Sequence, residues 1–542
     1  MLTVRFCPEI KRFLHVSEEL LLKLGVILRE RRAVEVSEIV KTTGVHLVLR
    51  FVFAQRGTEQ YSPLYTFQRM DRQSGDNCRL VRLALSLLWT KHSSADMTDS
   101  SVFDAIVIGG GAAGLTAGVE LGKAGLSVLL LEARERLGGR ILTTRSSSSE
   151  FPIELGAEFI HGIVPQTWDL LLEEHAEIVE VEGDLWCSDG RLRPCDFTDD
   201  VDRVLERMDD GVPDQSFADF LRSCCRGDSP VKERAKERAR RYVVGFNAAD
   251  PEQVGVHWLA KGLREEQEVK GERAFRSKNG YADLIKSLQS RLAASQVTVR
   301  TNVIVTAINW RESIVTVSAR GSDGNCSYQA KKVVVTVPLP ILRTEPGKEG
   351  AIEFHPPLPL EKREALQKLQ MGKVIRLVLR FRERFWDSII PPGASGQSLA
   401  NMGFLFTENE YFPTWWTTLP FREPQITGWA PFQCAERLSG KDNAFVAHYG
   451  LQSLSQILQV RLSNLEHLLE GAYFHDWQSD PFSRGAYSYG RVGADGAQEM
   501  LAKPLKPGLY FAGEATASPG SNGTVHGAIA SGHRVASEIL RS

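Results

Sequence analysis

The chain has 542 residues, enough for more than one domain with a sizeable core in each. Hydrophobic residues make up 42% of it and charged residues 24%, which is ordinary for a soluble globular protein. A net charge of −2 indicates no polyanionic partner, so we expect no nucleic-acid partner. No uninterrupted apolar run reaches the roughly 18 residues that span a bilayer, and the best candidate, 47–54, is short and contains Arg50.

The cysteines give a first indication of the compartment. The chain has eight of them, none in C-x-x-C spacing, and Cys224–Cys225 is a vicinal pair rather than a disulfide framework. This usage suits a reducing environment. We therefore expect a cytoplasmic protein with no metal site.

Residues 1–96 differ from the rest of the chain. They are rich in arginine, their apolar patches follow no sustained period, and they lack the three-part pattern of a signal peptide. One interpretation is a small appended domain with helices over 18–31 and 34–42. We favour another, in which residues 1–96 are an N-terminal extension of the gene model and translation starts at Met97, six residues before the first clear strand.

The segment 103–140 carries the clearest signal. An apolar run at 105–108 has the pattern of a buried parallel strand, and it breaks into glycine. Gly109 permits a tight turn, Gly111 lets the backbone approach a pyrophosphate, and Gly114 lets the next helix pack closely on the strand. The helix that follows starts with free N–H groups directed at an anion. The pattern predicts a dinucleotide-binding turn.

A second apolar run, 127–131, ends at Glu132, where a carboxylate can accept hydrogen bonds from a ribose. The chain continues through Arg134 and Gly139 to Arg140, and an arginine there can bind phosphate in a fork. The E-x-x-x-x-x-G-G-R spacing is typical of FAD enzymes rather than of simple NAD dehydrogenases. We therefore predict FAD as the ligand.

After Arg140, the polar tract 146–149 predicts a loop or hairpin tip. The sequence IELGAEFIHG at 153–162 then predicts a short strand that turns at Gly156. Small residues at Gly156 and Ala157 let the backbone pass close to a flat ring, with Glu158 and His161 following toward an active site. Taken alone, His161 is equally well explained as an ordinary loop histidine.

Residues 165–275 have helical patterns at 168–175, 199–208 and 230–242 and are predicted to cap a substrate cavity. The basic residues at 232–241 alternate with glutamate and alanine, which favours a solvated helix face over a nucleic-acid patch.

The chain then returns to the nucleotide fold and leaves it once more. A helix over Ala282–Ala293 and strands at 297–301, with Val303, at 314–319 and at 333–337 imply a nucleotide domain built from separated pieces. Between 340 and 475, Val374–Phe381 predicts a strand, and 412–416 with Trp429 supply aromatic bulk.

The last segment begins with a buried strand at 509–512. Gly513 and Glu514 follow as a sharp turn, where backbone and carboxylate can meet a ribityl or phosphate group. A helix is predicted over 524–540, with an N-terminus that faces the flavin ring and stabilises negative charge on it. Two helix N-termini would thus converge on one elongated ligand.

Together these motifs resemble the flavin-containing amine oxidase family, which includes monoamine oxidases, polyamine oxidases, L-amino-acid oxidases and lysine-specific histone demethylases. The resemblance covers nearly all of 103–542 and rests on GGGAAGL with LEARERLGGR, ELGAEFIHG, GKVIRLVLRFRERFW, DWQSDPFSRGAYSY and YFAGEATASPGSNGTVHGAIASG. It implies an α/β fold, with a Rossmann-type FAD-binding domain of the glutathione-reductase type and a discontinuous α+β substrate domain. We place the FAD-binding domain at 103–165, 276–340 and 476–542, and the substrate-binding domain with its helical cap at 166–275 and 341–475.

The resemblance also implies a reaction. Family members transfer a hydride equivalent from the carbon next to nitrogen to the flavin, after which the imine hydrolyses and oxygen is reduced to hydrogen peroxide. Such chemistry needs little acid or base from the protein. The site has to supply a dry, aromatic-walled slot that holds a neutral amine.

Four residues correspond to the family's catalytic positions. Tyr487, ten residues after Trp477, matches the tyrosine that forms one wall of the aromatic cage, although a packed core tyrosine is the alternative. Thr524 takes the opposite wall, within a TVHGA motif similar to that of polyamine oxidases and histone demethylases, and His161 matches a polar position that faces the substrate amine. Arg376 stands ten residues before Trp386, where many members have a lysine that holds a water near the flavin.

Arg376 is the main departure from the family. Lys373 is a poor substitute, because three residues along a strand point to the opposite face. Arginine is longer and has a planar fork instead of a compact ammonium. We therefore hypothesise that Arg376 occupies the lysine's place and slows the reaction of the reduced flavin with oxygen.

Monoamine oxidases link flavin to a cysteine immediately before the cage tyrosine, whereas this chain has Ala486, so FAD is expected to bind noncovalently. The residues predicted to bind it are Gly109, Gly111, Ala112, Ala113, Gly114, Glu132, Ala133, Arg134, Gly139, Arg140, Gly156, Ala157, Glu158, Val303, Trp477, Gly513, Glu514, Thr524 and Val525.

The predicted function is oxidation of a primary amine or polyamine, with a small-molecule amine and molecular oxygen as reactants. Two alternatives stay open: a same-fold flavin desaturase or dehydrogenase acting on an apolar substrate, and a flavoprotein that binds amines without turnover. A histone demethylase role is not expected, because the chain has no long helical insertion in the substrate domain. The sequence does not identify the amine or the oligomeric state.

Overall fold

The computed structural model describes residues 35–42, 45–56, 60–69, 97–224, 229–518 and 520–542. The chain forms two compact units, Met1–Ser94 and Ala95–Ser542. In the first unit, β1 (Glu35–Thr42), β2 (Val45–Arg56) and β3 (Gln60–Arg69) form an antiparallel sheet. The helix expected over 34–42 is therefore wrong, because the β-branched residues of EVSEIVKT favour a strand. The helix expected over 18–31 lies outside the described residues.

The second unit is built on an eight-stranded sheet. Its parallel part has the order β13 (Val297–Arg300), β5 (Val128–Leu131), β4 (Met97–Ile108), β16 (Gly324–Val335), with β25 (Leu509–Phe511) also paired to β16. The sheet continues through β15 (Val315–Gly321), β14 (Ile304–Asn309) and β17 (Glu353–His355). Its strands come from distant parts of the chain. β17 belongs to this sheet although it follows the boundary that we drew after residue 340.

Both faces of this sheet are buried. Ile106, Leu129 and Val333 pack in one apolar cluster, whereas the alternate residues Val107 and Leu130 pack in another on the opposite face. This continuous burial is what a parallel sheet covered on both sides requires. The second cluster includes residues of α4 (Ala112–Lys123), α5 (Pro165–Glu173), α10 (Ala282–Ala293) and α16 (Val525–Leu540).

A seven-stranded sheet forms the second layer. Its order is β11 (Leu192–Pro194), β10 (Asp184–Ser188), β20 (Met402–Thr407), β21 (Thr414–Thr417), β22 (Gln425–Pro431), β19 (Val374–Phe381), β23 (Leu469–Tyr473). Every residue of β19 is buried. An apolar cluster joins this sheet to α12 (Gln433–Leu438), α13 (Asn443–Leu458) and α14 (Leu462–Leu468).

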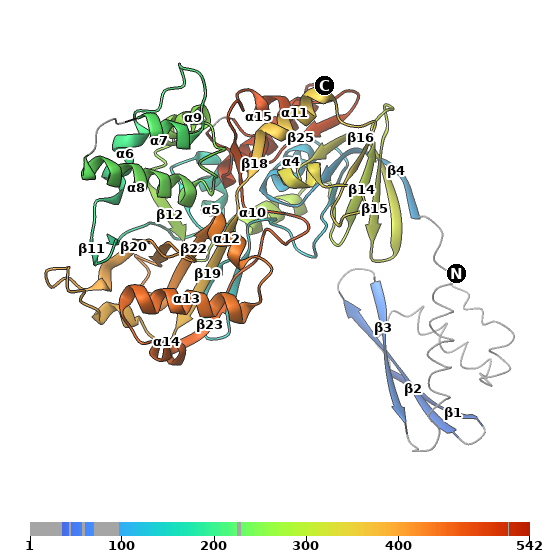
Figure 1. The fold of residues 1–542 in the computed structure, drawn as a ribbon. Helices are drawn as coiled ribbons and strands as arrows, with labels where there is room; N and C mark the ends of the chain where they lie inside the picture. The colour runs from blue at the N-terminus through green and yellow to red at the C-terminus, as the bar shows by residue number, and fades with distance from the viewer. Residues whose placement is uncertain (1–34, 43–44, 57–59, 70–96, 225–228, 519) are drawn as a thin grey trace. The chain divides into compact units, whose positions relative to one another are not determined.

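A group of helices follows β11 in the chain: α6 (Phe197–Leu205), α7 (Phe217–Ser223), α8 (Pro230–Phe246) and α9 (Val256–Glu268). Figure 1 shows them in green beside β20 and β22, away from the eight-stranded sheet. The helices predicted at 168–175, 199–208 and 230–242 correspond to α5, α6 and α8, with ends shifted by a few residues. The later helices α6, α8 and α9 form the cap, whereas α5 packs with α4, α10 and α16 in the apolar cluster of the eight-stranded sheet.

The remaining elements are short. Residues 146–149 form the tip of a hairpin between β6 (Thr143–Ser146) and β7 (Ser149–Glu154), as predicted. The others are β8 (Ile160–His161), β9 (Ile178–Glu180), β12 (Ala274–Ser277), β18 (Leu369–Met371), β24 (Ser488–Gly490), α11 (Leu360–Lys368), α15 (Ala497–Ala502), η1 (Leu339–Arg343), η2 (Phe385–Ser388), η3 (Leu399–Asn401) and η4 (Glu514–Thr516). Within the described part of the chain, no helix is long and apolar enough to cross a membrane.

Candidate active site

One large cavity of about 1410 Å³ runs through the second unit. It extends from the glycine turn after β4, past the ends of β4 and β5 and over residues of β19, β20, β21 and β22, to the cap helices α6, α8 and α9. All predicted site residues line it except Gly114. A Cβ atom on Gly114 would lie 1.9 Å from the Gly109 carbonyl oxygen, so this glycine serves close packing of α4. The structure thus brings residues from the whole length of the unit to one chamber.

The glycine turn fits a pyrophosphate. Gly109 has φ +106°, and a Cβ there would lie 2.6 Å from Thr336 Oγ1, so only glycine is tolerated. At Gly111, by contrast, the nearest atom to an added Cβ is 3.9 Å away, which leaves the backbone open toward the cavity. Helix α4 begins there with no side-chain cap and no acid in its first turn. Its first N–H groups are therefore available to an anion.

Charged residues form hydrogen bonds and ion pairs at the end of the cavity next to the glycine turn. Glu132 is buried at the end of β5, where its Oε2 accepts a 2.7 Å hydrogen bond from the Gly110 N–H. Arg134 donates to Asp480 Oδ1 over 2.6 Å. Burial alone would raise the pKa of Asp480, but the contact with His475 and the charge of Arg134 hold it at about 2. This pair therefore stays charged and holds the β5 end of the cavity to the 475–485 segment.

Arg140 connects the turn to the C-terminal segment. Its Nη1 donates to Glu514 Oε1 over 2.9 Å and to the Ala486 carbonyl oxygen over 2.7 Å. The other carboxylate oxygen of Glu514 accepts hydrogen bonds from Ser488 Oγ and the Gly523 N–H. The phosphate contact predicted for Arg140 stays a prediction. Within the protein, its Nη1 is already hydrogen-bonded to these two oxygens.

Close backbone approach occurs where a flat ring was expected. A Cβ on Gly156 would lie 1.9 Å from the Arg140 carbonyl oxygen and 3.3 Å from the Trp477 ring. Trp477 is buried and donates from Nε1 to the Leu155 carbonyl oxygen over 2.8 Å. The side chain of Trp477 is thereby held against the 155–157 backbone, and both line the cavity.

The two residues predicted as cage walls differ in what they present. Tyr487 donates from its hydroxyl to the Phe246 carbonyl oxygen over 2.6 Å, and burial raises its pKa. Thr524 is the N-cap of α16: its Oγ1 accepts from the Gly527 N–H and donates to the Ser521 carbonyl oxygen. The Thr524 hydroxyl is therefore committed to the helix cap, and the residue contributes shape to the cavity.

Arg376 occupies the buried centre of β19 and is 3% exposed. Its Nη1 donates to the Gly156 carbonyl oxygen over 3.0 Å, and its Nη2 donates to Glu158 Oε2 over 2.5 Å. Arg276 Nε lies 3.2 Å from Glu158 Oε1. Lys373 instead pairs with Glu436 at the surface, as its position along the chain predicted. Glu158, predicted to contact the cofactor, thus lies between two buried guanidinium groups.

An aromatic wall surrounds this cluster. Trp416 donates from Nε1 to Glu158 Oε2 over 2.9 Å, and its ring lies 5.5 Å from that of Phe159 and 5.6 Å from that of Trp429. Further rings that line the cavity are Phe404, Tyr242 and Phe246. The site prediction missed these residues, although the aromatic run at 412–416 with Trp429 was the available signal. Aromatic rings thus line the cavity next to the Arg376–Glu158 pair.

Two neutral histidines line the same space. Burial and, to a smaller extent, the nearby His526 lower the pKa of His161 to about 4. Burial lowers the pKa of His526 to about 4 as well. Both imidazoles are therefore uncharged near neutral pH. His526 was missed in the sequence, where its place in the first turn of the 524–540 helix was the only signal.

Four carboxylates surround the cap end of the cavity: Asp202, Glu206, Glu266 and Glu272, called here the acidic mouth. No ion pair joins any of them to a cation among the described residues, whereas the neighbouring Arg241 is already held by Glu237 and Glu408. Burial, together with the charges of Glu272 and Asp202, raises the pKa of Glu266 to about 7. The acidic mouth could not be predicted from a local pattern, because its residues come from separate elements.

The similarity to known proteins covers most of the second unit. A sequence model of a family described as flavin containing amine oxidoreductase matches residues 112–540. Polyamine oxidase 2 of Arabidopsis thaliana is 29% identical over 461 residues, which covers 79% of this chain and 86% of that protein. Lysine-specific histone demethylase 1 homolog 3 of the same plant is 28% identical over 509 residues, covering 80% of this chain and 30% of that protein. The chain spans less than two thirds of the length of such demethylase relatives, including 53% of human lysine-specific histone demethylase 2.

Solved structures show the same fold at low identity. A putrescine oxidase bound to putrescine superimposes with a TM-score of 0.66 at 21% identity, covering 82% of this chain and all of that one. Cyclohexylamine oxidase from Brevibacterium oxydans IH-35A gives a TM-score of 0.65 at 18% identity, covering 81% and 99%. The predicted α/β fold is thereby confirmed.

Proposed function

We propose that this chain, which belongs to the flavin-containing amine oxidoreductase family, oxidises an amine that carries a second positive charge, such as a diamine or polyamine. It is an oxidoreductase that acts on CH–NH or CH–NH2 groups, and its cofactor is FAD. When bound, FAD supplies the acceptor for a hydride equivalent. The products of the proposed reaction are an imine and, through oxygen, hydrogen peroxide.

The residues around the ring end of the cavity suit a neutral reacting amine. Transfer of a hydride from carbon requires the adjacent nitrogen to have a free lone pair, so an ammonium must lose its proton first. The aromatic wall and the uncharged His161 and His526 offer no anion that would hold the proton on nitrogen. Glu158, the nearest carboxylate, is already neutralised by Arg376 and Arg276. The reacting end of the substrate is therefore bound as the free base.

The observation that carries the proposed substrate class is the acidic mouth. Its four carboxylates line the same cavity as Tyr487 and Arg376. No ion pair among the described residues joins any of them to a cation, although the charge of Arg273 acts on Glu272. Glu266 is the most enclosed of the four, and its raised pKa reflects burial among like charges. A distal ammonium group at this place would relieve the repulsion. A monoamine leaves the repulsion unrelieved.

The test is a panel of substrates given to the purified holoenzyme. Flavin reduction without oxygen, oxygen uptake and peroxide release would be measured with α,ω-diamines, polyamines, alkyl monoamines, amino acids and apolar alcohols. We expect diamines or polyamines to reduce the flavin with the highest kcat/KM. Equal rates for a monoamine of the same length would contradict the substrate class, and reduction by no amine would favour a desaturase-like or a non-catalytic flavoprotein.

A second candidate function comes from the relatives named lysine-specific histone demethylases. A methylated lysine in a basic peptide also joins an oxidisable C–N bond to further positive charge, so the acidic mouth would suit it. The longest described helix of the substrate region, α8, has 17 residues, in line with the absence of a long helical insertion. A peptide arm with dimethyl-lysine belongs in the same panel.

We also propose a cytoplasmic location and no nucleic-acid partner. The net charge of −2 supports the second point. The location rests on the cysteine spacing alone, to which the Cys187–Cys195 disulfide is an exception. Fractionation of the native protein and a binding assay with DNA and RNA test them.

A further inference from the structure

A disulfide bond joins Cys187 of β10 to Cys195, one residue after β11. Cysteine spacing did not predict this bond, whose ends are eight residues apart. The two strands pair with Cys187 opposite Arg193, so the bond closes an edge hairpin of the seven-stranded sheet. Cys187 is buried at 4% exposure, whereas Cys195 is partly exposed. A small reagent therefore meets the Cys195 sulfur first.

The disulfide fixes the start of a cavity wall. Helix α6 begins at Phe197, two residues after Cys195, and the Phe197 ring stacks on that of Phe406 at 4.0 Å. Phe197, Val201 and Asp202 of α6 line the active-site cavity, as does Glu206 just after it. The bond thus anchors the helix that carries part of the acidic mouth.

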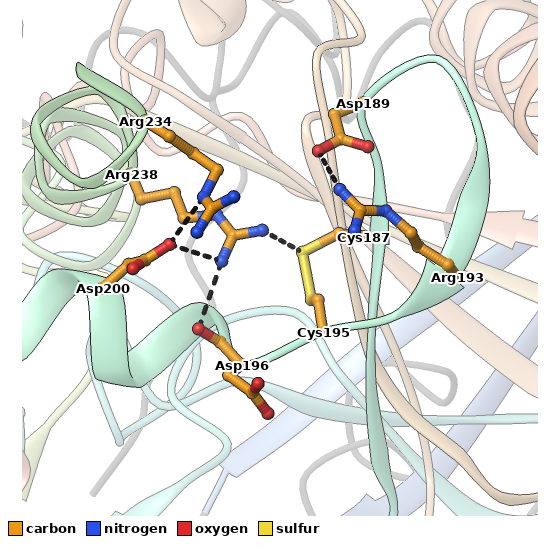
Figure 2. The surroundings of a disulfide bond; sticks show 8 residues. All are labelled: Cys187, Asp189, Arg193, Cys195, Asp196, Asp200, Arg234 and Arg238. Atoms are coloured by element: carbon orange, nitrogen blue, oxygen red, sulfur yellow. Dashed lines mark hydrogen bonds and ion pairs between the residues drawn. A yellow bond between two sulfur atoms is a disulfide. The ribbon is translucent and has the colours of Figure 1, made fainter. Parts of the chain in front are cut away.

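A buried guanidinium lies beside the inner sulfur, as Figure 2 shows. Arg238 Nη2 is 3.5 Å from Cys187 Sγ, and its Nη1 donates to Asp200 Oδ2 over 3.0 Å and to the Asp196 carbonyl oxygen over 3.1 Å. Arg238 therefore contacts the disulfide, the segment after it and α6 together. A positive charge next to sulfur stabilises a thiolate.

We propose that the Cys187–Cys195 disulfide is a redox-sensitive lock on the α6 wall, and that its opening by a dithiol weakens amine binding. This regulation rests on the proposed amine-oxidising function. In a reducing compartment a disulfide is usually a sensing or catalytic bond.

A thiolate of the dithiol attacks Cys195 Sγ, the S–S bond breaks, and its electron pair leaves with Cys187 Sγ as a thiolate beside Arg238. The second thiol of the reagent attacks the mixed disulfide and releases the Cys195 thiolate, so the dithiol is oxidised by two electrons and two cysteines are formed. Hydrogen peroxide reverses the step, since two thiols and one peroxide give one disulfide and two waters.

Opening the bond removes the covalent link between β10 and the segment 189–196 and leaves their backbone pairing. The Cys195 N–H still donates to the Leu185 carbonyl oxygen, so the sheet itself stays intact. What is lost is the covalent restraint at the N-terminus of α6. Motion of α6 displaces Asp202 and Glu206 but leaves the glycine turn and the Trp477 region untouched, because these lie on other elements. The expected effect is therefore on amine binding and not on the flavin.

The experiment uses the full-chain holoenzyme, treated with dithiothreitol without oxygen and then desalted. Alkylation followed by mass spectrometry counts the thiols, hydrogen exchange follows residues 195–206, and flavin reduction by a diamine gives a half-saturation concentration and a limiting rate. The double variant Cys187→Ala/Cys195→Ala mimics the open state without reagent. A Cys434→Ala variant, which removes a free cysteine from α12, is treated in parallel as the control.

We expect faster exchange over 195–206 and a roughly fivefold or greater rise in half-saturation, with little change in limiting rate or flavin spectrum. The double variant should behave like the treated enzyme, and the control should respond to dithiothreitol like the wild type. Unchanged exchange and half-saturation after complete reduction would overturn the lock, as would a bond that resists the dithiol in the folded enzyme. If no amine reduces the flavin of the oxidised enzyme, the proposed function fails, and hydrogen exchange alone decides whether the disulfide restrains α6.

Discussion

Arg376 Nη2 donates a hydrogen bond to Glu158 Oε2 over 2.5 Å, and their side chains are only 4% and 11% exposed. The partners come from β19 and from the segment after β7, 218 residues apart. Arg276 approaches the other carboxylate oxygen, and burial lowers its pKa while Glu158 raises it. One carboxylate thus compensates two buried cations at the wall of the cavity.

Replacing Glu158 with glutamine should strongly destabilise the protein. The variant leaves Arg376 and Arg276 without a counter-charge, and breaking a buried pair from one side typically costs about 3–5 kcal/mol. The thermal midpoint of the holoenzyme measures the loss. Glu470→Gln is the matched control, because Glu470 faces the buried Arg380 but is itself 30% exposed. A loss no larger than that of the control would contradict this account of the pair.

Replacing Arg376 with lysine should speed the reaction of the reduced flavin with oxygen. A lysine has a compact ammonium with freely rotating donors, whereas the arginine fork is held by Glu158 and the Gly156 carbonyl oxygen. We expect a gain on the order of tenfold, equivalent to about 1.4 kcal/mol of barrier. Stopped-flow mixing of the reduced enzyme with oxygen measures it. Arg380→Lys, on the same strand and outside the cavity lining, should leave the rate unchanged; an unchanged rate in Arg376→Lys would refute the hypothesis.

Replacing Glu266 with glutamine should raise KM for diamines and leave KM for monoamines nearly unchanged. The lost attraction to a distal ammonium is worth about 1–2 kcal/mol, roughly a tenfold effect. Glu268→Gln, on the same helix but outside the cavity, is the control. A similar rise for both substrate classes would show that Glu266 acts on the fold of the cap and not on the distal charge.

Glu266 also predicts a pH dependence. Its folded-state pKa of about 7 lies above the ordinary value of 4.5, so the contribution of this one carboxyl to stability is fully present below pH 4.5 and is lost as pH rises through 7. Over the same interval the group becomes charged and binds a cation better. We therefore expect the ratio of diamine to monoamine kcat/KM to rise between pH 6 and pH 8, as measured by initial rates. Glu266→Gln should remove that rise.

Acid denaturation should release all the flavin into the supernatant. Ala486 precedes Tyr487, and Ala486 has no nucleophilic atom that could hold the cofactor covalently. Precipitation with acid followed by absorbance of the supernatant at flavin wavelengths checks this. Yellow colour that stays with the precipitate would contradict noncovalent binding.

Replacing Lys362 with methionine should destabilise the second unit. Lys362 Nζ is buried in α11 and donates to the carbonyl oxygens of Met500, Leu501 and Lys503 at 2.7–3.1 Å. Its loss leaves the C-terminal carbonyls of α15 unpaired, which costs about 1–3 kcal/mol. Thermal unfolding measures the effect, and Lys368→Met, an exposed lysine of the same helix, should have almost none.

Local pattern was sufficient for the elements of the nucleotide fold. The apolar runs before Gly109 and Glu132 are found where the sequence predicted them, because burial of both sheet faces leaves a continuous apolar signal. The helix Ala282–Ala293 and, in the seven-stranded sheet, the strand Val374–Phe381 also lie at their predicted positions. The prediction failed over 34–42, where β-branched residues outweigh any helical period and β1 forms.

The sequence by itself determined the dinucleotide turn, the α/β fold and the family, because each depends on residues that are neighbours along the chain. Only the tertiary structure decided that Glu158 lies between Arg376 and Arg276. It also decided that the Thr524 hydroxyl caps helix α16 and that four carboxylates lie together at the acidic mouth. It also joined Cys187 to Cys195. These pairings depend on how distant segments pack, and packing energy is shared over many contacts, so no short stretch of sequence encodes them.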